Sequence, residues 1–106
     1  FIVRQLGSSV PQVDPGSYIG RITSQLGLMG GTERIANIIL LQASVAKLTN
    51  GRAPAGIAAA CVYISTRVLG DSVTQGDIAR SAGVTEVTIR NRYKELVKKL
   101  EINVHL

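Results

Sequence analysis

The feature that most restricts the fold of this chain is the segment 54–64, which reads Pro-Ala-Gly-Ile-Ala-Ala-Ala-Cys-Val-Tyr-Ile. Proline suits the first position of a helix, and a helix that is apolar on nearly every side needs neighbours on every side. Most of these side chains are small, so those neighbours can approach closely. The sequence therefore predicts a central helix that begins at Pro54 and is closed by Gly70. The uninterrupted apolar or glycine run, 55–64, is shorter than the roughly 18 residues needed to span a bilayer, so we expect a soluble protein with no membrane partner.

The composition favours a single all-α domain. The chain has 106 residues, 45% of them hydrophobic and 18% charged, which is enough apolar material for one core. Aromatic residues supply only 4%, so aliphatic and alanine side chains must pack closely. Around the central helix, apolar spacing and end signals predict helices at 15–27, 32–48, 75–82 and 85–99, and no convincing strand.

The predicted helix 32–48 has a broad apolar surface. Thr32 is a suitable N-cap, and Asn50 with Gly51 supplies a left-handed stop after the last turn. We expect this helix to be substantially buried through its apolar residues, which are Ile35, Ile38, Ile39, Leu41, Val45 and Leu48.

Reactive side chains are scarce. The chain has one cysteine, Cys61, and one histidine, His105, which cannot form an internal disulfide or complete a four-ligand zinc site. Cys61 lies in the alanine-rich helix and is interpreted as an inert core residue. No paired-carboxylate or triad pattern stands out. We therefore expect no catalytic residue, no metal and no cofactor, and we interpret the chain as a non-enzyme.

The charge points to a polyanionic partner. Twelve basic and seven acidic residues give a formal net charge of +5. Such an excess permits attraction to nucleic acid without proving it. Nucleic acid is therefore the leading partner class.

The segment 74–99 fits a helix-turn-helix. Thr74 caps the helix 75–82, and Gly83 stands where a tight corner needs a left-handed backbone before the helix that starts at Thr85. Helical hairpins with a glycine corner are common, so the pattern alone is of moderate specificity. The second helix carries the discriminating feature, because its two faces differ.

Helical spacing turns one face of the last helix outward. Its inward residues are Ile89, Tyr93, Leu96 and Leu100, which leaves Val87 and Arg90 on the opposite face. In a major groove a valine can pack on a thymine methyl while an arginine donates two hydrogen bonds to guanine. We therefore consider Val87 and Arg90 candidate base-contacting residues. The candidates for backbone or nearby contacts are Thr85, Thr88, Asn91, Arg92, Lys94 and Lys98.

A simpler interpretation stands beside this one. A basic stripe on a terminal helix is usually a solvated face, and one exposed valine needs no explanation. Lys47, Arg52 and Arg67 lie at helix ends, where cations offset the carbonyl dipole, so a structural role is favoured for them over DNA contact.

Two stretches resemble a known family. They are 51–64 (GRAPAGIAAACVYI) and 83–96 (GVTEVTIRNRYKEL), and both are similar to the second cyclin-like repeat of archaeal transcription initiation factor B, the counterpart of eukaryotic factor IIB. The resemblance implies a five-helix cyclin-like fold with a C-terminal helix-turn-helix. It also implies that residues 1–14 are the end of a preceding repeat and a linker, and that 15–106 form the repeat, with the helix-turn-helix at 74–99. Because the chain starts at Phe1 without a signal peptide, we expect it to be a fragment of a longer protein.

The resemblance also implies a function. Members of this family bind the complex of TATA-binding protein with double-stranded promoter DNA, and the last two helices of the second repeat read a purine-rich element upstream of the TATA box. By motif position, Val87 and Arg90 are the base-contacting residues. RNA polymerase is engaged through the zinc ribbon and the segment after it, which this sequence lacks, so it is a partner only through parts absent here. The implied protein is a cytoplasmic, nucleoid-associated monomer.

Two alternatives remain open. Cyclin-like helical domains also serve as protein-docking modules, and a positive surface can meet an acidic partner. A stand-alone helix-turn-helix repressor is a third possibility, but it normally needs a dimer to read two half-sites.

Overall fold

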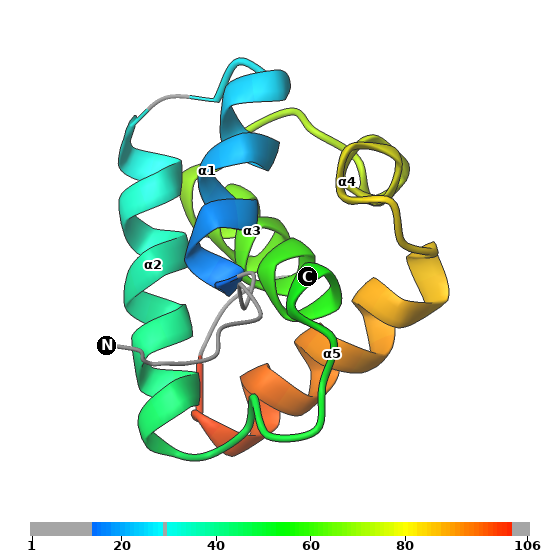
Figure 1. Ribbon diagram of the computed structural model, residues 1–106. Helices are drawn as coiled ribbons and strands as arrows, with labels where there is room; N and C mark the ends of the chain where they lie inside the picture. The colour runs from blue at the N-terminus through cyan, green and yellow to red at the C-terminus, as the bar shows by residue number, and fades with distance from the viewer. Residues whose placement is uncertain (1–13, 29, 103–106) are drawn as a thin grey trace, which may run out of the picture.

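The structure is a computed structural model that describes residues 14–28 and 30–102. This part of the chain forms five helices and no strand (Figure 1). The predicted linker and preceding-repeat residues 1–13, and 103–106 of the tail with His105, lie outside the described residues. The helices are α1 (Pro15–Gln25), α2 (Gly30–Val45), α3 (Pro54–Leu69), α4 (Gln75–Ala82) and α5 (Glu86–Lys99).

Helix α3 is the centre of the fold, as predicted. It contacts α1, α2, α4 and α5, which surround it in Figure 1. Every residue from 56 to 66 is buried, so the helix has no solvent face over three turns. Small side chains permit this, because the neighbouring backbones can come close. The helix begins at Pro54 and ends at Leu69, and its C-cap is Gly70, whose φ of 76° is left-handed.

The core position of α3 makes its cysteine unreactive. Burial raises the pKa of the Cys61 thiol to about 12. A thiol with so high a pKa stays protonated near neutral pH and is a poor nucleophile. None of the helices in residues 14–28 and 30–102 is long and apolar enough to cross a bilayer.

The start of α2 differs from the prediction. The helix begins at Gly30, so Thr32 lies inside its first turn rather than at the N-cap. The Thr32 side chain is fully buried, and its hydroxyl donates to Asp71 Oδ2 at 2.5 Å. The Thr32 carbonyl accepts from the Ser65 hydroxyl on α3 at 2.6 Å. Thr32 is therefore fixed by contacts with residues far along the chain, and it does not act as a local helix cap.

The end of α2 also differs. The helix stops at Val45, three residues before the predicted end. Lys47 has a φ of 62°, and the Leu48 N–H donates to the Ala43 carbonyl at 2.8 Å, which is a Schellman-type stop without glycine. Gly51, with a φ of 72°, belongs to a later turn.

The prediction that α2 is substantially buried is wrong for one stripe. The buried α2 side chains are Thr32, Ala36, Ile39 and Ala43. Ile38, Leu41 and Val45 are 49%, 65% and 76% exposed. The four buried residues form the face of α2 that packs against the core, and three of them are small. Ile38, Leu41 and Val45 lie on the other side of the helix and remain in solvent.

Candidate nucleic-acid interface

Helix α4 and the corner after it have well-formed ends. Thr74 Oγ1 accepts from the Asp77 N–H at 3.0 Å, and Asp77 Oδ2 accepts from the Thr74 N–H at 3.2 Å, which completes a capping box. These hydrogen bonds, with a smaller effect from Arg80, lower the pKa of Asp77. Gly83 ends α4 in the left-handed region at φ 73°, and its N–H donates to the Ala79 carbonyl at 2.9 Å. Helices α4 and α5 therefore form the predicted helix-turn-helix.

Two threonines organise the start of α5. Thr85 is the N-cap, and its Oγ1 accepts from the Thr88 N–H at 3.1 Å. The two hydroxyls are also 3.1 Å apart and hydrogen-bonded. Thr85 and Thr88 therefore have structural roles at the end of α5 that carries the candidate base readers.

The inward face of α5 is a continuous ridge. Ile89 and Leu96 are fully buried, and Tyr93 is 9% exposed. The Tyr93 ring packs on the Tyr63 ring of α3, with centroids 4.9 Å apart and planes tilted by 40°. Leu100, the C-cap, is half-buried. The predicted docking of this ridge against the bundle is confirmed, and it determines the rotation of α5 about its axis.

The opposite face carries the candidate residues for nucleic acid. Val87 is 55% exposed, Arg90 is half-buried, and Asn91, Lys94 and Lys98 are exposed. Within the described residues, no ion pair involves Arg90, Lys94 or Lys98. The structure thus brings an aliphatic side chain and a guanidinium together in the first half of α5, with two ammonium groups further along.

The first turn of α3 and the start of α5 approach each other closely. A Cβ added at Gly56, in the first turn of α3, would lie 3.0 Å from Thr88 Cγ2. Real Cβ atoms rarely come so close to a neighbour, so the absence of a side chain at Gly56 permits this contact. A larger residue at position 56 would require the Thr88 side chain or its helix to shift by a few tenths of an ångström.

A small groove lies beside this contact and was not predicted from the sequence. It has a volume of about 240 Å³ and is lined by Gly51, Arg52, Ala53, Gly56, Thr88, Asn91 and Arg92. Arg52 Nη2 lies 3.0 Å from Glu95 Oε2, and Arg92 Nη1 lies 3.6 Å from Glu95 Oε1. Arg92, predicted as a surface or phosphate-contacting charge, is thus half-buried at the groove and faces a carboxylate.

The other helix-end cations have different surroundings. The Arg67 Nη2 donates to the Val73 carbonyl at 2.8 Å, and its guanidinium carbon stands 5.3 Å from the centre of the Tyr63 ring. The predicted structural role of Arg67 is confirmed by these contacts, which tie the end of α3 to the segment before α4. Lys47 is exposed in the turn after α2.

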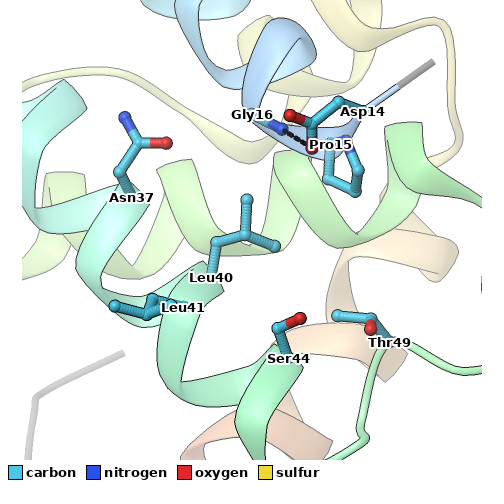
Figure 2. A pocket seen from close by; sticks show the side chains of 8 residues that line it. All are labelled: Asp14, Pro15, Gly16, Asn37, Leu40, Leu41, Ser44 and Thr49. Atoms are coloured by element: carbon cyan, nitrogen blue, oxygen red, sulfur yellow. Dashed lines mark hydrogen bonds between the residues drawn. The ribbon is translucent and has the colours of Figure 1, made fainter.

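A second hollow lies on the other side of the loop that precedes α3. It has a volume of about 320 Å³ and takes its walls from the start of α1, the second half of α2 and Thr49 (Figure 2). The Leu40 and Leu41 side chains give it an apolar side, and Asp14, which accepts from the Gly16 N–H at 3.1 Å, stands across from them. No residue of α4 or α5 lines it, so it is separate from the candidate interface. Among the residues that the structure describes, no three His, Cys, Asp or Glu side chains gather as a metal site.

The five helices form an all-α, cyclin-like domain that ends in a helix-turn-helix. A family model described as the transcription factor TFIIB repeat matches residues 8–99, and the chain belongs to this family. The chain is 55% identical over 102 residues to transcription initiation factor IIB of Pyrodictium occultum, with 96% of the chain and 33% of the relative covered. It is 47% identical over 106 residues to the factor of the same name from Archaeoglobus fulgidus, covering all of the chain and 32% of the relative.

A third relative is the transcription initiation factor IIB of Methanocaldococcus jannaschii, which is 49% identical over 106 residues and of which the chain covers 16%. The chain therefore spans about a third of the first two relatives and less of the third. Initiation factors are not enzymes, so these relatives agree with the interpretation of the chain as a non-enzyme. The resemblance noted in the segments 51–64 and 83–96 is confirmed at the level of the family.

Proposed function

We propose that this chain is a promoter-DNA-binding domain of a general transcription initiation factor. In this proposal the helix-turn-helix reads the purine-rich element upstream of the TATA box in the major groove. The domain also assembles with TATA-binding protein on the same DNA. The relatives are initiation factors by name, and the reading of DNA by α4 and α5 is proposed from the family resemblance and the surface of α5.

The observation that carries the proposal is the division of α5 into two faces. Ile89 and Leu96 are fully buried, while Val87 is 55% exposed and shares its face with Arg90. A helix anchored by one face presents the other in a defined orientation, which base reading requires. A valine and an arginine one turn apart on the same face suit contacts with a thymine methyl and with a guanine, respectively.

The dimensions of α5 fit a major groove. A helix of 14 residues is about 21 Å long, and a B-DNA major groove about 12 Å wide admits it. Val87 and Arg90 lie near the amino end of the helix, where recognition helices of this motif contact base edges. Lys94 and Lys98 lie about 6 and 12 Å further along the axis than Arg90, which suits phosphate contacts rather than base contacts.

The remaining candidates are assigned smaller roles. Asn91 and Arg92 line the groove beside α5, so we assign them to contacts with the DNA backbone or its vicinity. Thr85 and Thr88 bond to each other at the helix start and act mainly by holding Val87 in position.

The interface of a single helix-turn-helix is small. Single modules of this kind bury roughly 600 to 1,000 Å² of protein surface, and their attraction to phosphates falls steeply with salt. We therefore expect the chain alone to bind DNA weakly and TATA-binding protein to tighten the complex. RNA polymerase is engaged, in this proposal, by other parts of the longer factor.

The test is a titration of the chain against two promoter duplexes that differ only in the upstream element, one intact and one scrambled. We expect tighter binding to the intact element, by roughly 10-fold or more at moderate salt, since each wrong base pair costs about 1 to 3 kcal/mol. Adding TATA-binding protein should increase the affinity for the intact duplex. Equal binding to both duplexes, with and without TATA-binding protein, would contradict the proposal.

A second candidate function, docking of another protein, has an observation of its own. Ile38, Leu41 and Val45 form an exposed aliphatic stripe on α2, next to the hollow lined by Leu40 and Leu41. Chemical-shift mapping with promoter duplex separates the two functions. Changes confined to α4 and α5 support DNA reading there, no changes favour docking, and changes confined to α2 would place the nucleic-acid interface on α2. A monomer in sedimentation argues against a two-fold repressor, which needs a dimer to read paired half-sites.

A further inference from the structure

One carboxylate beside α5 faces two guanidinium groups. Glu95 Oε2 is 3.0 Å from Arg52 Nη2, and Glu95 Oε1 is 3.6 Å from Arg92 Nη1. Arg52 belongs to the loop before α3, 43 residues earlier in the chain. Glu95 Oε1 is buried and accepts no hydrogen bond within the described part of the chain. One of the two positive charges at this end of the groove is therefore neutralised from within the protein.

We propose that Glu95 is an internal counter-ion that limits how strongly this face attracts DNA of any sequence. The inference rests on the proposed function, because the groove and the candidate base readers share α5. Arg52 and Arg92 both line the 240 Å³ groove, and Asn91 joins them there. A phosphate that enters the groove meets two guanidinium groups together with the carboxylate that already holds them.

Two effects of Glu95 on DNA binding have opposite signs. As a tether, it orders Arg52 against α5, and its loss would weaken binding. As a negative charge close to the path of the phosphates, it opposes binding, and its loss would strengthen it. The magnitudes favour the second effect. The side chains in these ion pairs are 19% to 41% exposed, and part-exposed pairs of this kind contribute little to holding two groups together. Each further phosphate that a protein neutralises, in contrast, steepens the salt dependence of DNA binding by about 0.9 in log K against log salt.

The test is Glu95→Gln, which keeps the shape of the side chain and removes its charge. Binding is measured against the intact and the scrambled promoter duplex over a range of salt concentrations. We expect both duplexes to bind on the order of 3- to 10-fold more tightly at about 0.1 M salt, with a slope steeper by about 0.9 and convergence with the unmodified chain at high salt. A purely structural role would not steepen the salt slope.

The matched control is Glu33→Gln. Glu33 is exposed in the first turn of α2, away from α5. Its substitution changes the net charge of the protein by the same amount as Glu95→Gln. We expect it to leave affinity and salt slope nearly unchanged. An equal gain from Glu33→Gln assigns the effect to net charge and overturns the inference, as does weaker binding by Glu95→Gln. If the unmodified chain prefers the intact element and Glu95→Gln does not tighten binding, only this inference fails. If the unmodified chain binds no duplex, the proposed function fails with it.

Discussion

The outward faces of α5 and α2 both expose aliphatic side chains, but their surroundings differ. Val87 on α5 is 55% exposed and has Arg90 one turn away, with two lysines beyond it. Leu41 on α2 is 65% exposed, and its neighbours towards the end of that helix, such as Gln42, are uncharged. An apolar side chain among cations suits a polyanion with apolar edges, which is DNA. The α2 stripe, whose neighbours after Ile38 within the helix are all uncharged, suits another protein surface instead.

The largest expected difference between the two helices is in stability. Ile89 on α5 is fully buried, whereas Ile38 on α2 is 49% exposed. Ile89→Ala leaves a cavity against α3 and should lower the free energy of unfolding by about 2 to 5 kcal/mol. Ile38→Ala should cost less than about 1 kcal/mol, because the side chain keeps much of its contact with water when folded. Urea unfolding followed by circular dichroism measures both. Equal losses would show that the two faces do not differ in burial as described.

The next largest difference is expected in base reading. Arg90→Ala should lower affinity for the intact promoter element by about 1 to 3 kcal/mol and relax the preference at one base pair, because the proposed bidentate contact to guanine would be lost. Arg34→Ala, which removes an exposed arginine from α2, is the matched control and should have little effect. Titrations against intact and scrambled duplexes measure the two variants. If Arg90→Ala lowers the affinity for both duplexes by the same factor, Arg90 contacts phosphates rather than bases.

A smaller and sequence-independent effect is expected at Lys94. Lys94→Ala should weaken binding to every duplex alike, by roughly three- to eightfold at about 0.1 M salt, and reduce the salt slope by about 0.9. The reason is that Lys94 is exposed on α5 one turn beyond Arg90, and we propose that it contacts phosphates rather than bases. Affinity measured at several salt concentrations tests this. A loss confined to the intact element would instead make Lys94 a base reader.

Much of the fold could be predicted from local pattern. The bounds of α4 were predicted as the structure has them, because Thr74 and Gly83 are end signals that act within a few residues. The division of α5 followed from helical period alone, and the burial of Ile89 confirms it. The role of α3 followed from its composition, since no other arrangement buries a helix that is apolar all round.

Two of the errors come from contacts between distant residues. The start of α2 was misplaced because the Thr32 hydroxyl bonds to Asp71, 39 residues away, rather than to its own helix. The groove beside α5 was missed because it brings Arg52, in the loop before α3, next to Arg92 on α5, and these residues are far apart in the chain. Cap and period rules describe neighbours in sequence, so neither contact leaves a signal that such rules can detect. The roles of Val87 and Arg90 in base reading remain predictions.

The smallest effects are expected from a substitution in the exposed aliphatic stripe of α2. Leu41→Gln replaces a side chain that is 65% exposed on α2, so the free energy of unfolding should change by no more than about 0.5 kcal/mol. Affinity for the promoter duplex should also stay the same, because α2 and α5 lie on different sides of α3 (Figure 1). Urea unfolding and the duplex titration measure both quantities, and Val87→Gln is the comparison variant on α5. Because Val87 is proposed to pack on a thymine methyl, Val87→Gln should weaken binding to the intact element while Leu41→Gln does not. The reverse order would place the nucleic-acid interface on α2 and leave α5 as a solvated basic helix.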